Sequence, residues 1–502
     1  MKGILTSISD GVARWDAARA QPSYRHGGVI IGAIACALVL AAPTPEGLPV
    51  MGQRTAAVAA LMGIWWLGGV LPIAVTAMVP LVALPILGIA TMKEAAAPFA
   101  HPLIYLMLGG FLLSHAMEQV GLHRRVTALL LRPAWVRARP ERVVLALMAA
   151  GAGLSGLVSN TATVLMMLPI ASRLAALCTD DPRTRSGFIL GLAYACSIGG
   201  VTTLVGTPPN AVLAGLAPEV AGREIGFAEW TFLGVPFAIL AVPLAWLVIT
   251  KVALPLPDRE WSLKAPETPA WAPGGRPVLA VVGAALVLWL TRKPILIGGA
   301  SLFGWSTLLP QGVVVDDAWV AILAGLTLFL VPGGPPGEDA EARFLLSFRK
   351  AEKAIPWSVL VLLGGGFSLA SAIGSSGLTA WLAGPLAGLG SLPGWAQVGI
   401  ICLGMTFLTE LTSNTATSQI CLPLLAAGAT AAGVEPLMWM IPATLSASCA
   451  FMMPVATAPN AIAAEAGGVS PGDMAFAGFL LNLLCAGLAT VVVLLLVPSI
   501  FG

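Results

Sequence analysis

A polar pentapeptide occurs twice in this sequence, each time inside a long apolar stretch: Ser159-Asn160-Thr161-Ala162-Thr163 and Ser413-Asn414-Thr415-Ala416-Thr417. The surrounding stretches, 143–178 and 397–433, are each too long for one membrane-spanning helix. An Asn between hydroxyl residues is costly halfway along a lipid-facing helix but is tolerated against a water-filled cavity. We therefore expect two re-entrant helical hairpins with these pentapeptides at their tips. Two ordinary spans joined by a loop would instead place each pentapeptide in solvent.

The composition indicates a membrane protein. Of the 502 residues, 57% are hydrophobic and only 10% are charged, whereas soluble domains carry about 25% charged residues. The net charge is +2, and neither end carries a charged tail. This charge balance gives no reason to expect a nucleic-acid partner. The low fraction of charged residues excludes an ordinary soluble protein.

Apolar runs suited to transmembrane helices recur along the chain, because about 17 to 25 apolar residues span the hydrocarbon core. Together with the two hairpins they predict an all-α polytopic membrane protein with about eleven spans. The eleven predicted spans lie at 28–43, 56–70, 72–90, 103–122, 187–216, 232–250, 278–295, 318–331, 357–378, 436–466 and 474–499.

The chain also repeats internally at a spacing of about 255 residues, which suits a duplicated transporter half. The pentapeptides are 254 residues apart. Two further anchors are Gly109-Gly110-Phe111 with Gly365-Gly366-Phe367, 256 residues apart, and Pro209-Asn210 with Pro459-Asn460, 250 residues apart. Inverted repeats of this kind place the substrate near the membrane midplane, between their broken helices.

Basic residues predict how the halves are oriented, because short cytoplasmic loops carry an excess of Lys and Arg. Segment 123–142 contains six arginines, whereas its counterpart 379–396 contains no Lys or Arg. Five predicted spans separate the start of the helix at 103 from its mate at 357. We therefore expect two repeats of inverted topology in the plasma (inner) membrane, with the N-terminus in the cytoplasm and the C-terminus outside.

Each repeat carries a predicted helix break, Gly206-Thr207-Pro208-Pro209-Asn210 in the first and Ala456-Thr457-Ala458-Pro459-Asn460 in the second. Proline frees a backbone carbonyl, so the breaks offer oxygen atoms to a cation. Oxygen cages of low charge suit Na+ better than a transition metal, and helix N-termini at the tips suit an anion. Because no Lys, Arg or His lies beside a tip or in a break, we expect anion binding to depend on co-bound Na+.

Other reactive side chains give weaker signals. The seven cysteines are isolated and predicted to be small hydrophobic groups, and the four histidines form no metal-binding pair, so structural or interfacial roles are expected. The long segments 252–277 and 332–356 contain no catalytic constellation, which argues against a membrane enzyme or a sensor. No organic cofactor is expected. Glu410, beside the second tip, is expected either to take part in proton coupling or to pair with a nearby backbone break.

At these residues the sequence resembles the divalent anion/sodium symporter family, the dicarboxylate, citrate and sulfate carriers. The resemblance extends from about residue 30 to the end and rests on helix order, both hairpins and the doubled Ser-Asn-Thr motif. It implies a homodimer in which each protomer has a scaffold and an elevator-type transport domain. The implied parts are scaffold helices in 1–100, a first repeat in 101–255, connecting and scaffold helices in 256–356 and a second repeat in 357–502.

The resemblance also implies the site residues. It assigns the substrate carboxylates to Asn160, Thr161, Asn414 and Thr415, with Thr207 and Pro208 lining the site. One sodium site would use Ser155, Ser159, Asn160 and Gly206, and the other would use Thr409, Thr412, Asn414 and Ala456. One position departs from the family, since Ala458 stands where a proline is usual. It restores an N–H and is expected to loosen the turn.

Together, these observations predict a secondary transporter, not an enzyme, that couples Na+ entry to uptake of a small C4 dicarboxylate such as succinate, malate or fumarate. Its expected partners are this anion, sodium ions, membrane lipid and a second copy of the chain. A sulfate or citrate symporter and a sodium-independent dicarboxylate exchanger stay open as alternatives on the same scaffold. A channel is disfavoured because the polar residues cluster at the midplane while the ends are apolar.

Overall fold

The structure of the protein, a computed structural model, describes residues 21–178, 180–257, 260–261, 263–297, 300–302, 304–333 and 343–501. The prediction of a cytoplasmic N-terminus concerns residues 1–20, which lie outside the described residues. The N-terminal elements of the described chain are α2 (Pro22–Ala41), α3 (Val50–Gly68), α4 (Ile73–Ala77), α5 (Val79–Ile86), α6 (Met92–Ala96) and the short 3-10 helix η1 (Ala97–Ala100).

The predicted span at 72–90 corresponds to a shorter apolar helical segment, Ile73–Ile86, that is interrupted near its middle. The structure has two consecutive short helices there, α4 and α5, which meet at Met78. Pro80 lies at the start of α5. In one continuous helix its ring would clash with the carbonyl four residues earlier and its missing N–H would leave that carbonyl unpaired.

The first repeat contains one helix pair and one broken helix at the predicted places. Residues 156–159 separate the two hairpin helices, and residues 201–207 interrupt the predicted span 187–216. The elements in order are α7 (Pro102–Gln119), α8 (Leu122–Leu130), α9 (Ala134–Arg137), α10 (Pro140–Ser155), α11 (Asn160–Cys178), α12 (Pro182–Gly200), α13 (Pro208–Val220), α14 (Phe227–Leu247) and the π-helical η2 (Val248–Ala253).

The connecting region corrects the expectation of a purely helical chain. Two three-residue strands pair antiparallel, with Leu296 opposite Ser301. The predicted span 278–295 ends earlier, at Leu290. The elements in order are α15 (Gly275–Leu290), β1 (Ile295–Ile297), β2 (Ala300–Leu302), the 3-10 helix η3 (Trp305–Leu308), α16 (Asp317–Leu330) and α17 (Phe348–Ala354). Apart from this small hairpin and an isolated bridge between Pro332 and Phe344, the described elements are helical.

The second repeat follows the same order as the first. Residues 410–413 separate its hairpin helices, and residues 448–457 interrupt the predicted span 436–466. The elements are α18 (Trp357–Ser375), α19 (Leu378–Ala387), the 3-10 helix η5 (Gly388–Ser391), α20 (Gly394–Thr409), α21 (Asn414–Ala431), α22 (Leu437–Ala447), α23 (Ala458–Glu465) and α24 (Pro471–Phe501).

Equivalent glycines pack in the same way in the two repeats. A Cβ added to Gly109 of α7 would lie 2.5 Å from the backbone carbonyl carbon of Ala321 in α16. A Cβ added to Gly365 of α18 would lie 2.7 Å from the Cα of Ala77 in α4. Each repeat's first helix therefore approaches a helix that precedes the other repeat.

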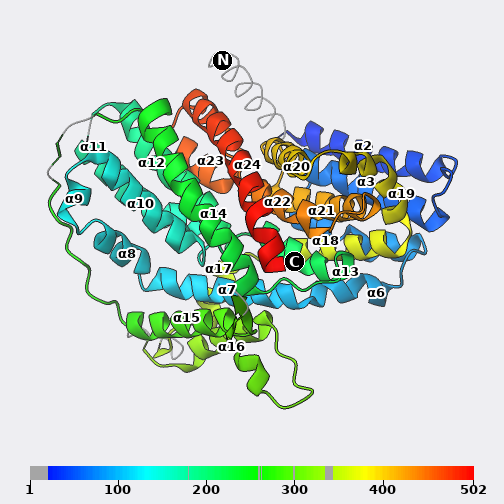
Figure 1. The fold of residues 1–502 in the computed structure, drawn as a ribbon, viewed down its shortest axis with the longest axis horizontal. Coiled ribbons are helices and arrows are strands. Elements are labelled where there is room, and N and C mark those ends of the chain that lie inside the picture. Colours follow the sequence, from blue (N-terminus) through cyan, green and yellow to red (C-terminus); the bar gives the residue numbers. More distant parts are fainter. Residues whose placement is uncertain are drawn as a thin grey trace.

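The two hairpins reach the centre from opposite ends of the molecule. In Figure 1, α8 to α11 lie at the left end, whereas α19 to α21 lie on the right. The helices α8 and α19, which follow α7 and α18, both start after a left-handed glycine, Gly121 with φ of 65° and Gly377 with φ of 77°. The repeat found in the sequence therefore corresponds to equivalent elements placed at opposite ends.

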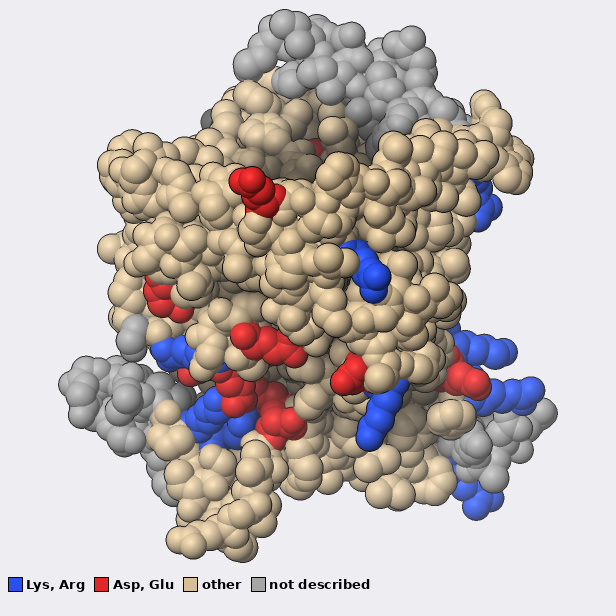
Figure 2. Space-filling view, turned by 90° about the vertical axis from the view of Figure 1, so that its right-hand side faces the viewer, with Lys and Arg blue, Asp and Glu red and all other residues tan. Residues whose placement is uncertain are grey.

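Six of the described helical segments are long and apolar enough to cross a membrane, among them Phe227–Ala253 and Pro471–Phe501. Other predicted spans correspond to shorter apolar helices, such as α15 and α16. Figure 2 shows the end of the molecule at which α2, α3 and α19 lie: charged side chains gather in its lower half and most of the remaining surface is uncharged. These features indicate an integral membrane protein.

Candidate substrate and cation site

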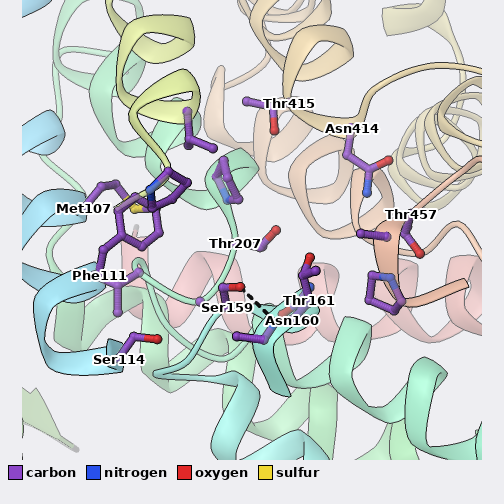
Figure 3. Close-up of a pocket in the computed structure, with 18 of the residues that line it drawn as sticks. Met107, Phe111, Ser114, Ser159, Asn160, Thr161, Thr207, Asn414, Thr415 and Thr457 are labelled. Carbon is purple, nitrogen blue, oxygen red and sulfur yellow. Dashed lines mark hydrogen bonds between the residues drawn. The ribbon is translucent and has the colours of Figure 1, made fainter. Parts of the chain in front are cut away.

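A cavity of about 690 Å³ lies where the two hairpin tips and the two helix breaks meet. Figure 3 shows Ser159, Asn160 and Thr161 of the first tip on one side and Asn414 and Thr415 of the second tip on another, with Thr207 between them. All the predicted substrate-binding residues line this cavity. The structure therefore brings together residues from both repeats that lie up to 255 positions apart in the sequence.

Helix N-termini converge on the cavity. The helices α11, α13, α21 and α23 begin at Asn160, Pro208, Asn414 and Ala458, and each of these residues is part of the lining. The first amides of a helix have no intrahelical partner, and the helix dipole gives this end a partial positive charge. Among the described residues that line the cavity there is no Lys or Arg. An anion bound here would therefore rely on helix termini, hydroxyl and amide groups, and a co-bound cation.

The first predicted cation site is compact. Ser155 is fully buried and its hydroxyl donates to the Asn160 Oδ1 atom at 2.6 Å, while Ser159 and Gly206 line the cavity. A Cβ on Gly206 would lie 3.1 Å from the Gly156 carbonyl oxygen. The absence of a side chain at this position therefore lets the helix break approach the hairpin tip closely.

The second predicted cation site contains an unpaired oxygen. The Asn414 Oδ1 atom is buried without a hydrogen-bond partner among the described residues. Ala456 lines the cavity, whereas Thr409 and Thr412 are not among its lining residues. The Thr409 hydroxyl donates to the Met405 and Thr406 carbonyls of its own helix, and the Thr412 hydroxyl lies 2.7 Å from that of Thr417. Leaving a buried acceptor unpaired is costly. The Asn414 oxygen is therefore free to accept a further partner.

Two asparagines brace the helix breaks in matching ways. The Asn210 side-chain amide donates to the carbonyls of Gly200 at 3.1 Å and Thr203 at 2.8 Å. The Asn460 amide donates to Ala450 and Met453, both at 3.0 Å. The sequence analysis treats these asparagines as repeat anchors and as parts of the helix breaks, and it does not predict that they brace the backbone. Their recurrence in both breaks was the signal that could have identified them as structural braces.

Glu410 holds the second break. Its Oε1 accepts from the backbone amides of Phe451 at 2.7 Å and Met452 at 2.8 Å, and its Oε2 accepts from Met453 at 3.0 Å. The Asn482 side-chain amide donates to Oε1 at 2.7 Å. Of the two roles expected for Glu410, this geometry supports pairing with the backbone break.

A hydroxyl group caps the helix that begins at Ala458, the position where a looser turn is expected. The helix α23 begins at Ala458, and the Thr457 hydroxyl caps it by accepting from the Asn460 amide at 3.2 Å. In the first break, Thr207 makes no such side-chain cap before its two prolines. The hydroxyl cap stabilises the second helix start at the position where a proline is replaced.

One wall of the cavity was missed by the sequence analysis. Met107, Phe111 and Ser114 of α7 face the tips in Figure 3, and His115 and Glu118 also line the cavity. The His115 ring also contacts its own helix, with Nε2 2.8 Å from the Gln119 Nε2 atom and Nδ1 3.6 Å from the Glu118 carboxylate. Ionisable residues inside an apolar span were the available signal.

The cysteines agree with the prediction, since all seven are free thiols. Cys178, Cys196, Cys402, Cys449 and Cys485 are buried, and Cys36 and Cys421 are partly buried.

Comparison with known proteins identifies the family. The fold matches the crystal structure of the YdaH transporter from Alcanivorax borkumensis with a TM-score of 0.57, 18% identity, and coverage of 82% of this chain and 89% of that one. The sequence matches the citrate transporter family, CitMHS, over residues 62–444 and 315–501. The chain belongs to the citrate transporter family. The predicted resemblance to divalent anion/sodium symporters is confirmed by two relatives within that group.

Two relatives of this member of the citrate transporter family align with the chain over nearly their whole length. The sodium-dependent dicarboxylate transporter SdcS of Staphylococcus saprophyticus is 35% identical over 500 residues, covering 96% of this chain and 93% of that protein. SdcS of Staphylococcus aureus is 34% identical over 492 residues, covering 95% and 92%. The family and its relatives are transporters, so the chain is a membrane transporter.

Proposed function

We propose that this transporter couples the entry of Na+ to the uptake of small C4 dicarboxylates such as succinate, malate and fumarate. The observation that carries the proposal is the cavity, where helix N-termini and two Ser-Asn-Thr tips meet without a Lys or Arg in the described lining. The printed names of the relatives, which are sodium-dependent dicarboxylate transporters, support the same cargo.

The two tips suit an anion with a carboxylate at each end. In the proposed complex, Asn160 and Thr161 bind one carboxylate, and Asn414 and Thr415 bind the other, while Thr207 and Pro208 border the substrate. One Na+ binds among Ser155, Ser159, Asn160 and Gly206, and a second binds among Thr409, Thr412, Asn414 and Ala456. Because each Asn serves both cation and anion, neutralisation by Na+ raises the affinity for the dianion, which is the basis of coupling.

The proposal includes an elevator mechanism in a homodimer of the plasma membrane. The hairpins and breaks would move as one transport domain, whereas helices in 1–100 and 256–356 would form the scaffold. The basic segment 123–142 would face the cytoplasm, as the distribution of Lys and Arg favours.

Uptake into proteoliposomes tests the proposal. Purified protein is supplied with radiolabelled succinate under an inward Na+ gradient and then with K+ in place of Na+. We expect uptake that requires Na+ and is blocked by excess malate or fumarate. Uptake that ignores Na+ but needs internal dicarboxylate would identify an exchanger and contradict the proposed coupling.

Competitors decide the substrate class, because a cavity of about 690 Å³ also admits larger anions. Unlabelled citrate and sulfate are added in the same assay at the concentration that abolishes succinate uptake with unlabelled succinate. The proposal expects weak inhibition by both. Strong direct transport of citrate or sulfate without succinate uptake would keep the fold and overturn the dicarboxylate assignment.

A further inference from the structure

A second cavity, of about 750 Å³, lies between α8, α11 and the connecting segment 263–269. Its lining contains no residue of the hairpin tips or helix breaks. Three cationic side chains, Arg124, Arg173 and Lys264, and one carboxylate, Glu267, border it. We call this cavity the basic groove.

The cations of the basic groove differ from their arginine neighbours. Arg125 donates to the Pro269 carbonyl at 2.5 Å and its guanidinium lies 4.0 Å from the centre of the Trp271 ring. Arg137 donates to the Leu263 carbonyl at 2.6 Å. These two arginines hold the connecting segment in place, whereas no ion pair is found for Arg124 or Arg173 among the described residues. The latter two cations are therefore available to an anion.

The α11 side of the groove is apolar apart from Arg173. Pro169, Ile170, Leu174 and Leu177 of α11 form part of the lining. From residue 169 to residue 177 a helix advances about 12 Å, at about 1.5 Å per residue. Leu177, nearest the end of the helix, is 55% exposed in the protein alone. These apolar side chains lie on both sides of Arg173, and together with the exposed Leu177 they suit an amphipathic lipid better than a water-soluble anion.

We propose that the basic groove binds an anionic phospholipid, with the lipid phosphate at Arg124, Arg173 and Lys264 and one acyl chain along α11. The charge balance of three cations against one carboxylate favours an anionic headgroup over a zwitterionic one. The α11 helix begins at Asn160 in the transport site, and segment 263–269 belongs to the connecting region. A bound lipid would therefore bridge the first hairpin to the connector and stabilise their present arrangement.

The test compares phosphatidylglycerol, phosphatidylcholine and inorganic phosphate on the detergent-purified full chain. Binding is measured by native mass spectrometry and by the shift in the midpoint of thermal unfolding. We expect phosphatidylglycerol to bind and raise the midpoint, phosphatidylcholine to bind more weakly, and inorganic phosphate to have no effect. Equal effects of the two lipids, or stabilisation by inorganic phosphate alone, would overturn the proposal.

The double variant Arg124→Gln/Arg173→Gln removes the two available cations. Each cation near a lipid surface contributes a factor of about five to binding, so the double variant is expected to bind phosphatidylglycerol about 30-fold more weakly. The matched control is Arg349→Gln/Lys350→Gln, which removes the same charge from exposed residues of α17 outside the groove. Equal weakening in both variants would mean a general charge effect and contradict the proposed site. Unchanged phosphatidylglycerol binding by Arg124→Gln/Arg173→Gln would also contradict the proposed site. The comparison of lipids on the unaltered protein remains a test even if a variant fails to fold.

Discussion

The two helix breaks occupy equivalent places in the repeats, yet they are closed by different groups. In the first break, the Val201 and Thr202 amides donate to the preceding carbonyls of Ile198 and Gly199 at 3.2 and 3.0 Å. The Thr203 hydroxyl donates to the Gly156 carbonyl. In the second break, one carboxylate, Glu410, accepts from three consecutive amides. Glu410 is the counterpart of Gly156, 254 residues later.

This difference shows which structural features the two repeats share and which they do not. Both repeats keep the Ser-Asn-Thr tip, the bracing Asn210 or Asn460, and the glycine contact of the first helix. The groups behind the tips differ, and only the second half of the described chain has a buried carboxylate in this position. The two proposed cation sites are therefore expected to depend on different supports, although the Ser-Asn-Thr tips that face the cavity are the same.

The largest expected effect tests what the halves share. Asn160→Ala and Asn414→Ala should each reduce Na+-dependent succinate uptake to background, because each amide is proposed to serve cation and substrate together. Size-exclusion chromatography should show unaltered assembly for both variants. The halves should differ in stability, since Asn160→Ala also removes the acceptor of the buried Ser155 hydroxyl, whereas the Asn414 oxygen has no partner among the described residues. Wild-type uptake by either variant would contradict the shared role.

The second prediction concerns what differs between the breaks. Glu410→Ala would leave the Met452 and Met453 amides and the Asn482 side-chain amide without their acceptor, while the Phe451 amide would keep the Asn482 Oδ1 atom at 3.2 Å. At about 1–3 kcal/mol for each unpaired group, the variant should lower the midpoint of thermal unfolding strongly. Thr203→Val, which removes one hydroxyl from the first break, should have a much smaller effect. Glu410→Gln, which keeps one acceptor oxygen, should fall between them. Equal midpoints for Glu410→Ala and Thr203→Val would mean that the carboxylate does not support the break.

A third prediction returns to the symmetric packing. Gly109→Ala and Gly365→Ala should each destabilise the protein by about 1–3 kcal/mol, because the added methyl group meets backbone of the neighbouring helix. Gly404→Ala is the control, since a Cβ there meets nothing within 4 Å. Thermal unfolding of the three variants checks this. Destabilisation by Gly404→Ala would mean that the close helix contact is not the cause. Unchanged stability at only one of Gly109 and Gly365 would contradict the equivalent packing of the two repeats.

The smallest effect is expected at the caps of the two breaks. Thr457→Val removes the hydroxyl that caps α23 and should cost about 0.5–2 kcal/mol. Thr207→Val should leave stability nearly unchanged because Thr207 makes no side-chain cap. The unfolding midpoints of the pair measure the difference. A larger loss at Thr207 than at Thr457 would contradict the assigned capping roles.

Features set by local sequence were predictable. The hairpin breaks fall at Ser159 and Ser413 because polar residues interrupt apolar runs, and long helices such as α14 and α24 follow from uninterrupted apolar sequence. The meeting of the two tips in one cavity followed from the inverted repeat. These are consequences of hydropathy and of internal symmetry, both of which can be read along the chain.

Features set by packing between distant residues were not predictable in the same way. The pairing of Glu410 with amides more than 40 positions later depends on how α20 packs beside the second break. The placement of His115 in the cavity depends on which side of α7 faces the tips. The short helices α8 and α19 lie in segments 123–142 and 379–396, for which only the distribution of charge was predicted.

The most direct test of the central claim is calorimetric titration of succinate into the purified protein in NaCl and in KCl at equal ionic strength. The claim is that an anion binds between the two tips only when Na+ supplies positive charge, because the described lining contains no Lys or Arg. We predict measurable binding in NaCl, loss of binding in KCl, and loss in both salts for Asn414→Ala. Equal succinate affinity in the two salts would contradict the claim.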